Sequence, residues 1–373
     1  GAAASGPGWP LRYATRFLTA NFMEPREGRF HAGIDLKTDG RPGVPVLAVE
    51  DGWVRELRAL PEGYGRAVLL RGDSGRDYVY AHLERFADRL RPPVAAAQAA
   101  SGRYRAVVAL PRDSLRVRRG EMLALSGQSG TVGPHLHFEV RGESDLALNP
   151  LRTGFAVPDT FPPRIVRIRA LPAGPGGRVE GGATAWSVAV GAGSPAELPP
   201  LRVRGPVAFA VEIRETIDVR GHPVAAHGLS VRLDGREVFA VRNDTLPLGL
   251  THARRCEWLE TGRVRAQWLH RWGGPALPGR EGGAWAADGP GLPPGRHQVE
   301  LAVTDLGGGR AVARWALLVE PAGESEAAAG SGAAKAGTEG EARAAGAAWR
   351  SDPVGVPLPP PGGAAARLVT PFL

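Results

Sequence analysis

Short apolar runs broken by glycine, proline and aspartate recur along most of the chain, and they constrain its fold more than any other feature. The 373 residues include 52 glycines and 34 prolines. Short apolar runs that alternate with polar residues are typical of β-strands, and the Asp-Gly, Gly-Asp and Ser-Gly pairs between them are typical of tight turns. The sequence therefore predicts an all-β protein with mainly antiparallel sheets, rather than a helical bundle.

The length of the chain predicts more than one domain, because a chain of this size can bury two or three separate cores. We expect residues 1–24 to form an extended lead-in and residues 25–157 to form a compact antiparallel β domain. Within that domain, residues 90–115 are an insertion that includes a short helix at 94–100. We expect this insertion to wall one side of a cleft.

The second half of the chain contains a further set of strand-like runs. Their spacing and turns predict a β-sandwich over residues 158–320, with a hairpin turn at 305–309. Residues 321–373 are rich in alanine, glycine and proline and are low in complexity. Such segments bury too little apolar surface to fold, so we expect a disordered tail.

Three short motifs carry every histidine of the predicted first domain. HAGID contains His31 and Asp35, YAHL contains His82, and HLHF contains His135 and His137. In the third motif the two histidines alternate with apolar residues, so both imidazoles project to one face of a strand, about 7 Å apart along the chain. Each motif alone fits an ordinary strand-end or surface residue. Their occurrence in one domain, at the ends of short strands, favours a metal site or an acid–base site.

The donor atoms of these motifs suit zinc. Where no thiolate is offered, zinc is bound by imidazole nitrogen and carboxylate oxygen, and a catalytic site uses three protein ligands and one open position. The chain has a single cysteine, Cys256, which excludes a thiolate cluster and a disulfide within the chain. The other five histidines stand singly in the second region and are expected to be ordinary surface or core residues: His222, His227, His252, His270 and His297.

The charge of the chain predicts anionic surroundings. The formal net charge is +8 and the isoelectric point is about 10.4, which suits a bacterial envelope or nucleic acid. No strand motif that combines basic and aromatic residues accompanies the charge, so we expect no nucleic-acid partner. No apolar run approaches the roughly 20 residues that span a bilayer. The sequence begins at Gly1 and not at methionine, which fits an exported protein trimmed of a targeting segment or simply the boundary of the sequence.

The motifs HAGID, YAHL and GPHLHFEVR, in this order, resemble those of the lysostaphin/LytM-type zinc endopeptidases, which cut peptides of bacterial peptidoglycan. The similarity runs from about Phe30 to Leu151 and includes EGYGRAVLLRGDSGRDYVYAHL and the closing NPL. It implies the duplicated-hybrid-motif β fold and one zinc ion per chain. Residues 158–320 also resemble the Ig-like C-terminal part of some envelope members of that family.

The resemblance assigns roles position by position. It implies that His31, Asp35 and His137 are the zinc ligands. His82 and His135 match the two histidines that flank the reacting water without binding the metal, and either of them could be the general base. The implied substrates are stem peptides and cross-links of peptidoglycan, and both the D-alanyl–diaminopimelate bond and a glycine bridge remain open.

The resemblance also bears on location and on an alternative function. It implies an exported protein of the periplasm, the cell envelope or the extracellular space, whose β-sandwich could bind an envelope protein. The alternative is a non-catalytic envelope protein of the same fold that binds the wall or activates an amidase. All five motif positions are filled in this sequence, which favours the enzyme.

Overall fold

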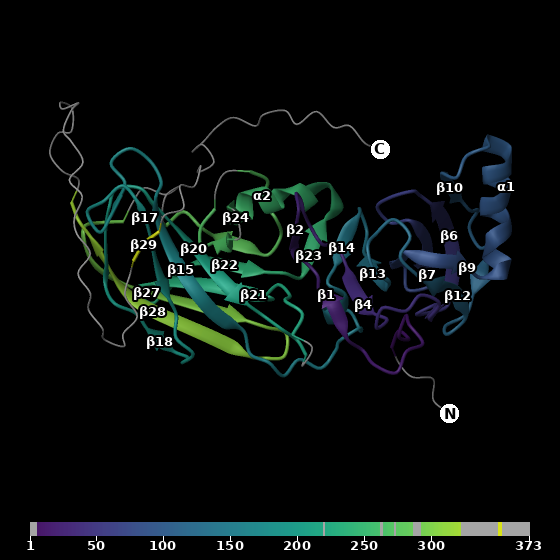
Figure 1. Cartoon of the computed structure of the whole chain (residues 1–373), viewed down its shortest axis with the longest axis horizontal. Helices are drawn as coiled ribbons and strands as arrows, with labels where there is room; N and C mark the ends of the chain where they lie inside the picture. The colour runs from purple at the N-terminus through teal and green to yellow at the C-terminus, as the bar shows by residue number, and fades with distance from the viewer. Residues whose placement is uncertain are drawn as a thin grey trace.

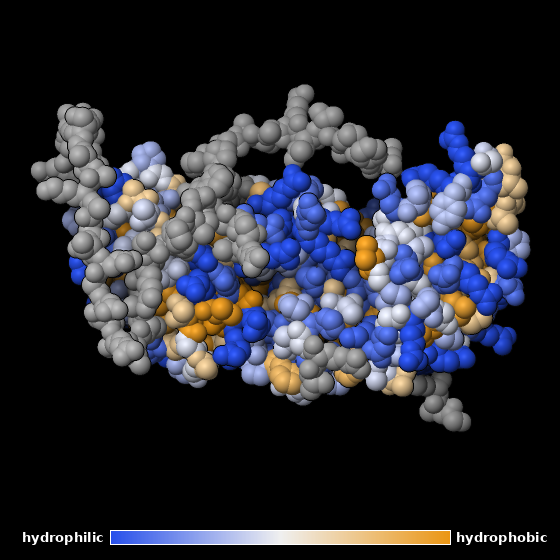
Figure 2. Space-filling view, in the orientation of Figure 1, coloured by the Kyte–Doolittle hydropathy of each residue, from blue (hydrophilic) through white to orange (hydrophobic). Residues whose placement is uncertain are grey.

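The computed structural model describes residues 6–218, 221–261, 264–271, 274–285, 292–321 and 350–352. These residues form two β-rich units that lie end to end along the long axis of the molecule (Figure 1). Nearly all strand pairs are antiparallel and helices are few, so the predicted all-β fold class is confirmed. The face shown in Figure 2 is largely hydrophilic with scattered apolar patches, because most apolar runs are buried in the two cores.

The first unit is built on one large antiparallel sheet. Its strands lie in the order β1 (Leu18–Ala20), β4 (Ile34–Lys37), β13 (His135–Arg141), β8 (Asp77–Ala81), β7 (Arg66–Gly72), β6 (Gly52–Ala59) and β10 (Ala106–Ala109), and β11 (Arg116–Val117) pairs with β6. The alternation in HLHFEV works as expected, because Leu136, Phe138 and Val140 are fully buried on one face of β13. The histidines of that strand therefore lie on the opposite face.

A smaller sheet covers the buried face of the first. It consists of β5 (Pro45–Leu47), β12 (Met122–Ser126) and β9 (Leu83–Phe86), and its apolar residues share one core with Ile34, Tyr80 and Phe138. A short hairpin, β2 (Pro25–Arg26) with β3 (Arg29–Phe30), leads into β4. The predicted lead-in contributes β1 to the large sheet, since Leu18 pairs with Leu36.

The insertion forms a helix and an edge strand at the far end of the first unit (Figure 1). After a single 3₁₀ turn, η1 (Asp88–Leu90), helix α1 (Arg91–Ser101) begins with Pro92 and Pro93 in its first turn, where proline is well tolerated. The helix ends at Gly102, whose φ of 64° is the left-handed conformation that glycine readily adopts. The predicted helix is therefore confirmed and starts three residues earlier than expected.

The second unit is a sandwich of two sheets. One has the order β24 (Trp258–Thr261), β25 (Val264–Trp268), β20 (Val207–Arg214), β15 (Arg164–Pro172), β17 (Ala185–Ala189) and β29 (Arg350–Asp352). The other has the order β16 (Arg178–Val179), β19 (Leu201–Arg204), β28 (Arg310–Val319), β27 (Gly295–Thr304), β21 (Gly228–Leu233), β22 (Arg236–Arg242) and β26 (Arg280–Gly282), with β18 (Ala196–Glu197) on β28. Ile168, Phe209, Leu301 and Trp315 belong to the core between them.

Two features of this unit were not expected from the sequence. The short strands β18 and β19 run parallel to β28, whereas the other pairs are antiparallel. Within the stretch for which the sequence predicts disorder, Arg350–Asp352 form β29 beside β17, and most of the remaining predicted tail lies outside the described residues. The Ig-like character of the sandwich stays a prediction. No helix among the described residues is long and apolar enough to cross a membrane.

The two units share a sheet and a small core. Strand β23 (Thr245–Pro247), from the second region, pairs with β14 (Leu146–Leu148), which in turn pairs with β13. Leu246 is fully buried in a cluster with Phe22, Phe30 and Ala147. The elements η3 (Leu248–Ala253) and α2 (Arg254–Glu257) follow directly. The predicted domain boundary at 157/158 lies in the linker, but part of the chain after it, including β23, packs with the first unit.

We expect Leu246→Ala to lower the free energy of unfolding by about 2–5 kcal/mol, because it leaves a cavity where β23 packs on the first unit. Urea denaturation of the full chain, followed by tryptophan fluorescence, measures the change. The control is Val166→Ala at an exposed position of β15, which should change the stability by no more than about 0.5 kcal/mol. Equal effects of the two substitutions would contradict the described packing of β23.

Candidate metal centre

The pairing of β4 with β13 brings the histidine motifs together. His137 lies directly opposite Asp35 on β4 and opposite Ala81 on β8, so His82, the next residue after β8, comes to the same place. The ring centroids of His31 and His137 are 4.8 Å apart, and those of His82 and His135 are also 4.8 Å apart. The structure thus gathers all five residues that the sequence singles out as site residues.

Three donor atoms form a small triangle. His31 Nε2 lies 2.9 Å from His137 Nδ1 and 3.2 Å from Asp35 Oδ1, and the other two atoms are 2.9 Å apart. All three residues are buried. Ligand atoms around a tetrahedral zinc ion, each about 2.1 Å from the metal, stand roughly 3.4 Å apart, so a slight expansion of the triangle would admit one ion. Two nitrogens and one carboxylate oxygen are also donors that zinc prefers.

Hydrogen bonds on the outer side of the two histidines orient their inner nitrogens. His31 Nδ1 donates to the backbone oxygen of Asn21 at 2.7 Å, which leaves the lone pair of Nε2 facing the triangle. His137 Nε2 lies 2.8 Å from Glu139 Oε1 and donates to it, so that in the neutral ring the lone pair of Nδ1 faces the triangle. Such partners fix the tautomer and ring orientation of metal-binding histidines.

Glu139 is the functional residue that the sequence reasoning missed. Its side chain is fully buried and also accepts hydrogen bonds from Tyr64 Oη and Arg141 Nε, both at 2.7 Å. A signal was available, because Glu139 stands two residues after His137 on the same alternating strand and must share its face. The carboxylate therefore supports His137 from behind, and Tyr64 and Arg141 hold the carboxylate.

The electrostatics of the cluster favour a positive charge at the triangle. Burial lowers the pKa of His31 to about 4, although Asp35 acts in the opposite direction. Burial also opposes the charged form of His137, but the hydrogen bonds that His137 donates to Asp35 and Glu139 outweigh burial and raise the pKa of His137 to about 9. Arg26 pairs with the outer oxygen of Asp35. The carboxylates of Asp35 and Glu139, on either side of the His137 ring, thus stabilise the positively charged form of that ring.

The two remaining histidines, His82 and His135, are also oriented by hydrogen bonds to backbone oxygens. His82 Nδ1 donates to the backbone oxygen of Ser129 at 3.0 Å, and His135 Nδ1 donates to that of Gly133 at 2.9 Å. In the neutral rings the lone pair is therefore on Nε2. Nε2 of His135 is buried without a hydrogen-bond partner among the described residues, and it lies 3.7 Å from Asp35 Oδ1. Burial lowers the pKa of both rings, that of His82 to about 3.

The cluster opens into a pocket of about 460 Å³. His31, His82 and His137 line its floor together with Tyr64 and Glu139. The wall opposite is formed by Leu248 and Thr251 of η3, in the second region. No residue of the insertion at 90–115 lines this pocket, so the prediction that the insertion walls the cleft is wrong here. Strand β10 of the insertion pairs with β6 at one edge of the large sheet, whereas β23 pairs with β14, which pairs with β13.

Part of the first unit is similar in sequence to known peptidases. Residues 29–99 match the model of peptidase family M23. The chain is 34% identical over 151 residues to an uncharacterized metalloprotease of Haemophilus influenzae, a match that covers 38% of this chain and 26% of that protein. It is 32% identical over 132 residues to the DD-carboxypeptidase/endopeptidase Mpg of Neisseria meningitidis serogroup B, over 35% of this chain and 24% of that protein. A solved structure of a zinc containing peptidase from Vibrio cholerae is 29% identical over 36% of each chain, with a TM-score of 0.27.

The matched segment spans about a quarter of the length of these two curated relatives. The family match includes His31, Asp35 and His82, and the strand that carries His135 and His137 pairs directly with the matched strands β4 and β8. The family predicted from the three histidine motifs is therefore confirmed. Residues 29–99 of the first unit thus match peptidase family M23.

Proposed function

We propose that this chain is a zinc-dependent endopeptidase that hydrolyses peptide cross-links of bacterial peptidoglycan. The observation that carries the proposal is one cluster of three metal donors and two further histidines, His82 and His135, whose Nδ1 atoms are taken up by backbone oxygens. His31, His82 and His137 of this cluster line the pocket. The names of the relatives, a metalloprotease and a DD-carboxypeptidase/endopeptidase, support this chemistry.

The five residues of the cluster have different roles in the proposed hydrolysis. His31, Asp35 and His137 would hold one zinc ion, which when bound polarises a peptide carbonyl and lowers the pKa of water toward about 7. His82 and His135 each offer a neutral Nε2 that can take a proton from the attacking water. Once protonated, the same nitrogen can donate to the oxyanion or pass the proton to the leaving amine. The two rings are equivalent in this respect, so either can serve as the base.

The charge around the pocket supports an anionic peptide as substrate. Arg29, Arg58 and Arg141 line it together with Glu139 and Asp145. Arg58 and Arg141 pair with Glu56 and Glu139, and in this proposal Arg29 binds a carboxylate of the substrate through paired hydrogen bonds. Peptidoglycan stem peptides carry free carboxylates, and the net charge of +8 suits a polyanionic wall. We further propose that the protein acts outside the cytoplasm, in the periplasm, the envelope or the extracellular space. In this proposal, the sandwich is an Ig-like accessory unit that can bind an envelope partner.

The division of roles predicts different losses for two neighbouring histidines. We expect His137→Ala to abolish zinc binding and activity, because it removes one of three ligands. We expect His135→Ala to keep the zinc and lose turnover by a factor of about 100 or more, as for a general acid–base residue. Zinc content by mass spectrometry and peptide release from purified sacculi measure the two properties. His297→Ala in the second unit is the control, and a zinc-loaded, fully active His137→Ala protein would refute the assignment.

Glu139 is expected to act through His137. Glu139→Gln should weaken zinc binding about 10- to 100-fold, because an amide is a poorer acceptor for His137 Nε2 than a carboxylate. Competition with a zinc-binding dye measures the affinity, and circular dichroism checks that the variant is folded. Glu143→Gln, at an exposed position beyond the end of β13, is the matched control. An unchanged zinc affinity in the folded Glu139→Gln variant would exclude this supporting role.

Removal of zinc distinguishes the enzyme from the non-catalytic alternative. We expect chelation to stop peptide release from sacculi and one equivalent of zinc to restore it. A protein that only binds the wall or activates an amidase would sediment with sacculi and release no peptides at any zinc loading. Mass spectrometry of the released fragments identifies the bond that is cut.

A further inference from the structure

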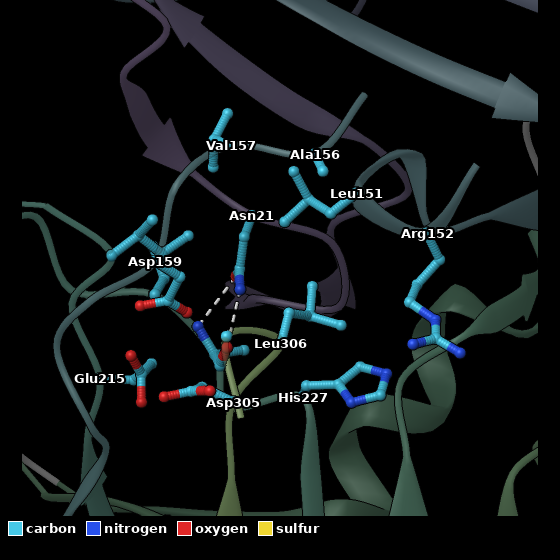
Figure 3. Close-up of a pocket in the computed structure, with 14 residues that line it drawn as sticks. Asn21, Leu151, Arg152, Ala156, Val157, Asp159, Glu215, His227, Asp305 and Leu306 are labelled. Carbon is cyan, nitrogen blue, oxygen red and sulfur yellow. Dashed lines mark hydrogen bonds between the residues drawn. The ribbon is translucent and has the colours of Figure 1, made fainter. Parts of the chain in front are cut away.

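Three carboxylates from separate segments meet where the two units join. Asp159 comes from the linker between η2 (Pro150–Arg152) and β15, Glu215 directly follows β20, and Asp305 directly follows β27. One oxygen of each lies within 4.8 Å of the others. Figure 3 shows the three carboxylates turned toward one another on one side of a cavity whose other side belongs to the first unit.

Part of this cluster is buried and lacks hydrogen-bond partners. Glu215 is only 2% exposed, and although its Oε1 accepts from the backbone N–H of Thr216, its Oε2 has no partner among the described residues. Oδ1 of Asp159 is likewise buried without a partner in the described part of the chain. A buried carboxylate oxygen without a donor or a cation is strongly unfavourable. The carboxylate of Glu215 lies beside those of Asp159 and Asp305 (Figure 3).

Within the part of the chain that the structure describes, no positively charged side chain that lines the cavity is paired with the cluster. Among the described residues, the basic groups that line the cavity are Arg152 and His227, and both pair with Asp244 instead, at 3.6 and 2.8 Å. Burial and the two neighbouring aspartates raise the pKa of Glu215 to about 8. Burial and Asp305 raise the pKa of Asp159 to about 6. Without a cation, Glu215 therefore keeps its proton at neutral pH, whereas a cation between the three groups would favour their ionised forms.

The surrounding backbone holds the three groups in place. Asp305 Oδ1 accepts the backbone N–H of Gly309 at 2.7 Å, which closes the β27–β28 turn. The turn packs directly on the linker, because a Cβ at Gly307 would lie 2.4 Å from the backbone oxygen of Asp159. The adjoining cavity of about 130 Å³ has room for water molecules. The carboxylates are thus fixed near one another with space for further oxygen ligands.

We propose that Asp159, Glu215 and Asp305 bind one divalent cation that prefers oxygen ligands, namely Ca²⁺, at the junction of the two units. All protein donors are carboxylate oxygens, which suit a hard cation, and water in the cavity completes the six to eight oxygens typical of Ca²⁺. The ion ties the linker to two strands of the sandwich. This site is separate from the metal centre at His137 and does not depend on the proposed peptidase activity.

One residue that lines this cavity, Asn21, also forms a hydrogen bond with the metal centre. Asn21 lines the cavity and forms two hydrogen bonds with the backbone of Ala225, from Nδ2 at 2.7 Å and to Oδ1 at 2.9 Å. The backbone oxygen of Asn21 accepts the hydrogen bond from His31 Nδ1. A cation that stabilises the junction therefore also stabilises the segment that orients His31.

The test uses the full chain, prepared in metal-free buffer and resupplied with one equivalent of zinc. We expect calorimetric titration at pH 7.5 to show one Ca²⁺ bound per chain, and saturating Ca²⁺ to raise Tm by several degrees, because a ligand that binds only the folded state stabilises it. Glu215→Gln should abolish both the binding and the Ca²⁺-dependent rise in Tm. Glu212→Gln, within β20 and three residues before Glu215, is the matched control; Glu212 pairs with Arg169, and the variant should retain both properties.

Two outcomes would overturn the proposal. One is the absence of Ca²⁺ binding with an unchanged Tm in the wild-type chain, which would mean that the carboxyl groups share protons instead of a cation. The other is Ca²⁺ binding that persists in Glu215→Gln, which would place the ion elsewhere. If Glu215→Gln does not fold, Asp159→Asn tests the same site. Zinc content and peptide release, measured on each variant, separate a failure of this site from a failure of the proposed peptidase.

Discussion

The register between β4 and β13 is the constraint on which the candidate site depends. It sets Asp35 directly opposite His137, and His31 reaches the same point from the residues that lead into β4. Because side chains alternate along a strand, a shift of one residue would turn His137 toward the core and Phe138 toward the pocket. The buried row of Leu136, Phe138 and Val140 opposes such a shift, so the apolar core fixes the geometry of the donor atoms.

Hydrogen bonds from the histidines to neighbouring oxygen atoms fix the orientation of the imidazole rings. The backbone oxygen of Asn21 orients His31, and Glu139 orients His137. The backbone oxygens of Ser129 and Gly133 do the same for His82 and His135. Each of the four imidazoles is thus held by a hydrogen bond from one ring nitrogen, and its other nitrogen faces the candidate metal site or the neighbouring rings. A site prepared in this way needs little rearrangement before it reacts.

The second unit is part of the architecture of the site and not only an appendage. Its strand β23 extends the large sheet, and Leu248 and Thr251 wall the pocket. Asn21 joins the two units through Ala225 and at the same time supports His31. The orientation of the sandwich therefore bears on the shape of the pocket, and the acidic cluster at the junction lies where that orientation is set.

Much of the site was predictable from local patterns. The alternation in HLHFEV determines which side chains share a face, and the motifs HAGID and YAHL identify the remaining site residues. The same alternation also contains the information for Glu139, since a residue two positions from His137 must face the same way. The helix at 91–101 and the strand-rich character of both units likewise follow from local periodicity and turn residues.

The sequence by itself thus predicted the β architecture, the family of the first unit and the candidate donor residues, because each of the patterns and motifs behind these predictions is a short stretch of chain. Only the tertiary structure decided that β23 joins the first unit's sheet, that η3 and not the insertion walls the pocket, and that Asp159, Glu215 and Asp305 meet. Each of these depends on contacts between segments tens of residues apart or more. No local pattern of hydropathy or turn residues specifies such contacts, since they arise only when the two units pack together.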